Sequence, residues 1–330
     1  MNDAGAVIVM HKRLIAPLFT WTSSVMVCAV LILGSIPYAA QGAPPDVITS
    51  IKPVQALVKM VTGNLATPGL VMPANTSPHL FTLKPSQAKL LENADVVFWI
   101  GPTLETTLQG PLKNLSDEAV VIELLKVAGL DLLELNDKHD EGNDDHDHGN
   151  VDPHIWLSPS NARILIDAIA ATLSAVDPNN APDYAHNAKK AKQRISISIR
   201  KTKAFTKEMR PTAYLVQHDG FGYLAREFEF NLVGYIQTMP GREPGARHIS
   251  KLLDQIKTKQ VECLFHESQF SPKLAKRLED EVGISVREID PMGIYLTMTE
   301  TTYVRIIQGI IVSMESCLFP RQSGKLIKGQ

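Results

Sequence analysis

The feature that most constrains the fold is a long stretch near the middle of the chain. Residues 183–210 are rich in alanine, lysine and arginine, contain no glycine, and lie between Pro182 and Pro211. Because proline interrupts helices and alanine favours them, this composition predicts one long, rigid helix, about 42 Å in length at 1.5 Å per residue. The stretch 195–199 alternates like a strand, which is the competing interpretation of the helix centre.

Short apolar runs alternate with amphipathic stretches on both sides of this helix, a pattern typical of βα units. Before it, strands are expected at 46–51, 94–101 and 119–124 and helices at 53–63 and 160–178. After it, strands are expected at 212–217, 231–236, 261–267 and 284–289 and helices at 246–259, 272–282 and 301–318. The runs at 94–101 and 119–124 are continuously apolar, as expected of parallel strands covered on both faces.

The sequence therefore predicts an α/β protein of two lobes, each with a mostly parallel sheet, joined by one long rigid helix. We expect an N-terminal lobe over 44–180, a linker helix over 181–210 and a C-terminal lobe over 211–330. The net charge of −2 offers no basic face, which argues against nucleic acid as a partner.

The first 43 residues have the composition of a secretory signal peptide. Lys12 and Arg13 precede an apolar run that is densest over 25–36, and small residues with proline follow it. Cleavage after Gly42 would place small residues at the two recognition positions. The alternative is an uncleaved membrane anchor, because residues 14–36 are long enough to span a bilayer.

Removal of this segment also removes Cys28 and leaves two cysteines, Cys263 and Cys317. An even pair in an exported protein predicts a disulfide. Closing a loop of about 55 residues would stabilise the fold by roughly 4 kcal/mol in the chain-entropy model. Two buried free thiols are the alternative.

Three histidines lie in loops next to predicted strands or helices, namely His79, His154 and His218. His218 and Asp290 directly follow predicted strands, where α/β sheets bind their ligands. Two of these four residues come from each lobe, so together they would form a site between the lobes. Imidazole is the usual protein ligand of Zn²⁺, and Asp290 would offset the charge of the ion directly or through water. Each histidine taken singly is more often a hydrogen-bonded loop residue, and spacing alone does not show that the three meet.

Six motifs occur in an order and spacing typical of one family. They are SPHLFTLKPS (77–86), DPHIWLSP (152–159), HDGFGYLARE (218–227), REPGARHISKLLDQIK (242–257), CLFHESQF (263–270) and DPMG (290–293). On these motifs, residues 46–319 resemble the metal-binding proteins of bacterial ABC importers (the cluster A-I, or cluster 9, family), and within it the zinc-specific ZnuA type. The resemblance implies two α/β lobes bridged by a long rigid helix, which agrees with the prediction above.

The resemblance also implies a function and a ligand set. It places the metal ligands of the family on His79, His154 and His218 and the aspartate of the family motif on Asp290. In related zinc proteins, water or a neighbouring carboxylate often takes the fourth position. The resemblance further implies the disulfide between Cys263 and Cys317, and a periplasmic monomer that delivers Zn²⁺ to a cognate ABC permease in the inner membrane.

The chain departs from the family pattern at two positions. Some zinc-type members carry glutamate before the first histidine, whereas this chain has Pro78 and lacks that ligand. Met292 stands where leucine is usual, a swap that roughly conserves volume. His266 and Glu267 adjoin each other in the predicted strand 261–267, where they could support the ligands from behind, with His266 as an alternative fourth ligand. The alternative is that His266 is simply a polar residue at the end of a strand.

The segment 139–149 carries His139, His146 and His148 among acidic residues and contains no apolar residue. Such a composition cannot pack into a core, so we expect a mobile loop. Zinc-type relatives have a loop of this kind at the same place, which implies an auxiliary site that collects zinc for the cleft or senses high zinc. A solvated acidic insert without a metal role is the alternative.

These observations predict a zinc-capture protein and not an enzyme. Manganese-type relatives usually carry glutamate at position 218, so histidine there favours Zn²⁺, although manganese or another divalent metal is the alternative cargo. A periplasmic zinc hydrolase would need a general base beside a metal-bound water, and Glu267 or Asp290 could serve, but the chain has no HExxH motif. An adhesin-like or zinc-storage role would rely on surface anchoring, which the sequence lacks.

Overall fold

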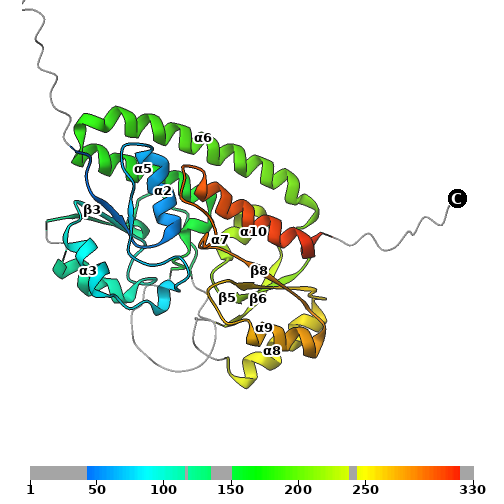
Figure 1. The fold of residues 1–330 in the computed structure, drawn as a ribbon. Helices are drawn as coiled ribbons and strands as arrows, with labels where there is room; N and C mark the ends of the chain where they lie inside the picture. Colours follow the sequence, from blue (N-terminus) through cyan, green and yellow to red (C-terminus); the bar gives the residue numbers. More distant parts are fainter. Residues whose placement is uncertain (1–42, 116–117, 135–150, 238–243, 320–330) are drawn as a thin grey trace, which may run out of the picture. The chain divides into compact units, whose positions relative to one another are not determined.

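The computed structural model describes residues 43–115, 118–134, 151–237 and 244–319. Within them the chain forms two four-stranded sheets, and all strand pairs of both sheets are parallel. The predicted α/β fold of two lobes is therefore confirmed (Figure 1). The predicted signal segment lies outside the described residues, apart from Ala43 at its end.

The N-terminal sheet has the strand order β2-β1-β3-β4. Its strands are β1 (Val47–Thr49), β2 (Gly69–Leu70), β3 (Val96–Trp99) and β4 (Val120–Glu123). The prediction that β4 is covered on both faces is wrong, because Val120 at its start is 41% exposed. Among the described strands, β4 lies at an edge of the sheet and pairs with β3 alone, so its apolar run is partly open to solvent. β2 was not predicted, since two residues are too few to show an alternating pattern.

The C-terminal sheet has the strand order β6-β5-β7-β8, and all four strands were predicted. They are β5 (Tyr214–His218), β6 (Leu232–Gln237), β7 (Cys263–Glu267) and β8 (Ser285–Ile289). Side chains alternate between the two faces of a strand. In β7, Cys263 and Phe265 belong to the large core, whereas Leu264 belongs to a second, smaller hydrophobic cluster.

Helices pack around both sheets. The first lobe contains α2 (Lys52–Thr62), α3 (Pro85–Glu92), α4 (Gln109–Leu115) and α5 (Pro159–Val176). The second contains α7 (Gly222–Phe228), α8 (Ala246–Thr258), α9 (Lys273–Val282) and α10 (Thr302–Leu318). Helices α3, α4 and α7 were not predicted, because each spans only about two turns and shows little periodicity.

The predicted long helix is α6 (Ala181–Phe205), which is continuous through the stretch that alternates like a strand. Its buried side chains recur every three or four residues, as at Tyr184, Ala188 and Ala191, so one face of the helix meets the core. α6 packs against α5 and α2, and α10 packs against α2 and α6 (Figure 1). The helix ends earlier than predicted, and a 3₁₀ turn (Thr206–Glu208) continues the chain toward Pro211.

The two lobes share one hydrophobic core. The large cluster includes Leu57 and Val97 from the first lobe, Val216 and Phe265 from the second, and Ile307 from α10. Because a common core resists separation of its parts, the lobes are held in a fixed arrangement by packing as well as by α6.

The predicted disulfide between Cys263 and Cys317 is confirmed. It joins β7 to α10, and the Cα atoms are 6.0 Å apart. Among the described residues, no helix combines the length and apolar character that a membrane crossing needs.

We predict that replacing both cysteines, as in Cys263→Ser with Cys317→Ser, will lower the free energy of unfolding by about 4 kcal/mol, because the unfolded chain regains the entropy of an open loop. Urea unfolding followed by circular dichroism measures this change. Reduced wild-type protein is the control and should unfold like the double variant. Equal urea midpoints for the oxidised wild type and the variant would contradict the prediction.

Candidate metal centre

His154 enters the site from a short, rigid segment of the first lobe. It immediately precedes the 3₁₀ turn Ile155–Leu157, and Ser158 then caps the start of α5 through its side chain. The Oδ1 atom of Asp152 accepts hydrogen bonds from the backbone N–H of His154 at 2.9 Å and from its ring Nδ1 at 2.7 Å. Both side chains are buried, so the carboxylate holds the ring in one orientation.

His218 is the last residue of β5, and its ring is held in a similar way by the second lobe. Glu267 is the last residue of the neighbouring strand β7, and its Oε1 atom accepts a hydrogen bond from His218 Nδ1. The other oxygen of Glu267, Oε2, accepts a hydrogen bond from Gln269 Nε2 at 2.9 Å. The ring of Phe270 packs edge-on against His218. The hydrogen bond to His218 Nδ1 is therefore the contact through which Glu267 would support this histidine.

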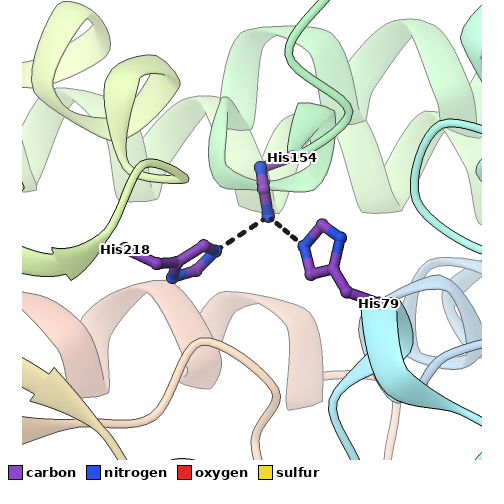
Figure 2. Close-up of side chains that lie close together, drawn as sticks. All are labelled: His79, His154 and His218. Carbon is purple, nitrogen blue, oxygen red and sulfur yellow. Dashed lines mark hydrogen bonds between the residues drawn. The ribbon is translucent and has the colours of Figure 1, made fainter. Parts of the chain in front are cut away.

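His79 comes from a different part of the first lobe. It lies in the 3₁₀ turn Pro78–Leu80, which follows β2 along the chain. The Nε2 atom of His154 lies 3.3 Å from Nε2 of His79 and 3.1 Å from Nε2 of His218 (Figure 2). One ligand atom from each of the three side chains lies within 4.8 Å of the other two. The structure thus brings together three of the four ligands that the sequence predicted.

The hydrogen bonds determine which nitrogen atoms of these rings can bind a metal. A carboxylate only accepts hydrogen bonds, so the Nδ1 atoms of His154 and His218 carry the protons when the rings are neutral. Their Nε2 atoms then present lone pairs toward each other. Two lone pairs at 3.1 Å repel, and a cation placed between them removes that repulsion.

Burial and neighbouring charges shift the pKa values of two of the histidines. Burial, with the nearby rings of His154 and His218, lowers the pKa of His79 to about 2. Burial also lowers the pKa of His218, but the surrounding carboxylates, Glu267 foremost, outweigh it and leave the pKa raised. His79 is therefore neutral at ordinary pH, whereas His218 holds a proton more readily than a free imidazole.

The space around the three rings is small and mostly apolar. The cavity has a volume of about 10 Å³ and is lined by the three histidines together with residues such as Trp156, Phe221 and Met292. Pockets for organic ligands are typically about 300–1,000 Å³, so this cavity suits a single ion or water and excludes a larger molecule.

Asp290 does not join the three histidines. In the described part of the chain, the group of side chains that could share a metal contains only His79, His154 and His218. The Oδ1 atom of Asp290 instead accepts a hydrogen bond from the backbone N–H of Met292 at 3.2 Å. Burial raises the pKa of Asp290, and hydrogen bonds from the backbone of the following residues partly counter this effect. Asp290 therefore shapes the turn that ends the strand β8.

Among the described residues, His266 is not part of the group of three side chains that could share a metal. Its neighbours in β7, Phe265 and Glu267, face the site and the large core, and alternation along the strand turns His266 to the opposite face. The auxiliary residues His139, His146 and His148 lie outside the described residues.

Sequence reasoning missed Asp152. An aspartate two residues before a candidate metal-binding histidine can bond both the backbone and the ring of that histidine, as Asp152 does with His154. The DPH triplet of residues 152–154 was the available signal.

The chain matches the family model of zinc-uptake complex component A, periplasmic, over residues 47–317. The high-affinity zinc uptake system protein ZnuA of Brucella abortus (strain 2308) is 32% identical over 327 residues, which cover 89% of this chain and 98% of that relative. A crystal structure of ZnuA is 25% identical, has a TM-score of 0.69, and covers 82% of this chain and 98% of its own.

One further solved structure shows the same fold with another metal. The Mn-bound periplasmic metal binding protein from Candidatus Liberibacter asiaticus is 23% identical with a TM-score of 0.65, and the match covers 82% of this chain and 99% of that one. At this identity the likeness extends to the fold alone. Because the family model spans most of the sequence and the curated relative is similar over nearly its whole length, the chain belongs to the ZnuA family of periplasmic zinc-uptake components.

Proposed function

We propose that this protein captures Zn²⁺ reversibly in the periplasm and delivers it to a membrane ABC permease for uptake. The observation that carries the proposal is the meeting of three imidazole Nε2 atoms, two of which have their Nδ1 atoms bonded to carboxylates. The names of the curated relatives, which are high-affinity zinc uptake system proteins, support the same function.

The spacing of the ligand atoms suits a zinc ion. Zn–N bonds of about 2.0–2.1 Å in a tetrahedral site place the nitrogen atoms about 3.3–3.4 Å apart. The distances from His154 Nε2 to His79 Nε2 and to His218 Nε2 are 3.3 and 3.1 Å. Small movements of the rings would therefore complete the site, and the fourth position is proposed to hold water, since Pro78 replaces a glutamate and Asp290 is bonded elsewhere.

Three imidazoles favour zinc over manganese, because Mn²⁺ prefers oxygen ligands. Cu²⁺ would bind such a site at least as tightly, so selectivity for zinc also depends on which metals reach the protein. Manganese remains the alternative cargo, and metal analysis of the purified protein distinguishes the two.

A binding role is favoured over hydrolysis by what the carboxylates of the site do. Asp152 and Glu267 are each bonded to the Nδ1 atom of a histidine, and Asp290 bonds the backbone of its own turn. None of the three is thereby available as a base beside a metal-bound water, which a zinc hydrolase needs. The disulfide supports export to an oxidising compartment.

We predict that His79→Ala, His154→Ala and His218→Ala will each weaken zinc binding by more than about 100-fold. The loss should exceed the roughly 10–100-fold cost of removing a residue that only hydrogen-bonds to a metal ligand. Competition with a chelating dye measures the dissociation constants. His186→Ala is the matched control, because His186 lies on the exposed surface of α6 and should leave the affinity unchanged. Full zinc affinity in any of the three site variants would refute the proposed function.

A second prediction concerns Gly220, which lies against the ligands. A Cβ atom there would come within 2.6 Å of His218 Nε2 and 3.0 Å of His154 Cε1. Because Glu267 and Asp152 hold both rings, Gly220→Ala should displace a ligand and weaken zinc binding about tenfold, or about 1.4 kcal/mol. The control is Gly110→Ala in α4, where a Cβ meets nothing within 4 Å. If both variants bind zinc like the wild type, the packing of Gly220 on the ligands has no role in binding.

A third prediction follows from the raised pKa of His218. In the metal-free protein a raised folded-state pKa contributes stability below the unfolded value of about 6.5, and this contribution is lost as the pH rises through the folded value. Zinc needs the neutral ring, so binding releases this proton and the affinity should fall about tenfold per pH unit below the raised pKa. The fall should thus begin above pH 6.5.

The Glu267→Gln variant tests the cause of this pH dependence. Removal of the carboxylate lowers the pKa of His218, so the fall in zinc affinity should begin at a lower pH than in the wild type. Titrations between pH 5 and 8.5 with a pH-independent competitor measure both onsets. Identical onsets in the two proteins would show that Glu267 does not control the proton on His218.

A further inference from the structure

Two chain segments meet beside the metal centre and form what we call the neck: residues 131–134, which lead into the segment 135–150, and residues 151–154, which follow it. Glu134 and Val151 form an isolated antiparallel bridge. The N–H of Asp152 donates a hydrogen bond to the carbonyl of Leu133 at 2.8 Å. The return bond of an ordinary antiparallel pair, from Leu133 N–H to Asp152 C=O, is replaced by a side chain from the other lobe.

That side chain is Tyr223, which is fully buried in α7. Its hydroxyl accepts a hydrogen bond from the N–H of Leu133 at 3.0 Å and donates one to the carbonyl of Asp152 at 2.9 Å. One hydroxyl therefore completes the pairing of the two halves of the neck. Its lone pair accepts the hydrogen bond from Leu133 and its single proton goes to Asp152, and no other assignment satisfies both backbone groups.

Asp152 connects the neck to the metal centre. The backbone of Asp152 is held by Tyr223 and Leu133, while its Oδ1 atom bonds the ring of His154 at 2.7 Å. A displacement of this residue moves the carboxylate that orients the His154 ring. A chain of hydrogen bonds thus runs from Leu133 through Tyr223 and Asp152 to the ring of His154. The last three of these residues are buried.

The rest of α7 reinforces this contact from the second lobe. Gly222 allows close approach, because a Cβ atom there would lie 3.1 Å from Leu133 Cδ1 and 3.5 Å from Asp152 Oδ2. The guanidinium of Arg226 lies over the ring of Tyr223. It also donates a hydrogen bond to the backbone oxygen of Asp131 at 2.8 Å and forms an ion pair with the Asp131 carboxylate at 3.0 Å. α7 follows His218 along the chain by only three residues, so the same element is attached to a second ligand.

We propose that Tyr223 is a positioning residue that couples the neck to the zinc ligand His154. This inference rests on the proposed zinc binding at the three histidines. Because coupling between two sites is reciprocal, zinc on His154 tightens the neck, and an intact neck strengthens zinc binding.

The first experiment measures backbone amide exchange in the full chain, with and without Zn²⁺, by mass spectrometry of peptides that cover residues 131–134. Zinc should slow exchange at the neck several-fold in the wild type. In Tyr223→Phe, which loses the hydroxyl but keeps the ring, zinc should leave exchange there unchanged. Slowing of equal size in both proteins would overturn the proposal.

The second experiment is a double-mutant cycle on zinc affinity with Tyr223→Phe and Asp152→Asn. Tyr223→Phe alone should weaken binding about fivefold, less than the roughly 10–100-fold loss for a direct partner of a ligand. In the Asp152→Asn background its effect should largely disappear, because the carboxylate through which it acts is gone. Full additivity, or unchanged affinity in the single variant, would overturn the proposal.

The control for simple loss of stability is Tyr184→Phe. Tyr184 is also fully buried, and its hydroxyl donates to Asp177 Oδ2 at 2.9 Å, where α5 meets α6. This variant should unfold at a lower temperature and yet keep wild-type zinc affinity and the zinc-dependent slowing at the neck. If it loses zinc affinity as Tyr223→Phe does, the effect is one of general stability. Failure of the proposed function itself would appear differently, as zinc binding that survives in His154→Ala.

Discussion

The structure of the candidate metal centre depends on two hydrogen bonds, each between a histidine ring and a carboxylate. Asp152 holds His154 and Glu267 holds His218, each through the Nδ1 atom. These bonds orient the rings and place the Nε2 lone pairs toward a common centre. They also supply negative charge behind the ligands, which offsets the charge of a divalent ion without occupying a coordination position.

The rest of the fold keeps these two pairs at a fixed separation. Each carboxylate lies in the same lobe as its histidine, so each pair is set by local structure: a turn before α5 in one case, and adjacent ends of β5 and β7 in the other. The distance between the pairs is set by the contacts between lobes. The shared hydrophobic core, α6 and the hydroxyl of Tyr223 all contribute to it.

This arrangement supports the proposed reversible capture of a metal. Two of the three rings are held by buried carboxylates of their own lobes, so the protein itself orients them for an ion. Protons compete with the metal ion for the ring of His218, because its raised pKa makes protonation easier than in a free imidazole. Acidic conditions therefore oppose binding, while the small apolar cavity excludes larger ligands.

The sequence by itself determined the two α/β lobes, the long helix and the disulfide pair, and it pointed to the three histidines that the structure brings together. Hydrophobic periodicity, the prolines at the helix ends and the family motifs are all signals that are local in the sequence. It placed Asp290 in the site and His266 near it, and only the tertiary structure showed that Asp290 bonds its own turn and that, among the described residues, the three histidines group without either of them. Tyr223 carried no recognisable sequence signal, whereas the DPH triplet offered a signal for Asp152 that was not used. The role of Tyr223 arises from its contacts with Leu133 and Asp152, which lie far from it in the chain, and such contacts depend on how the lobes pack rather than on any local run of residues.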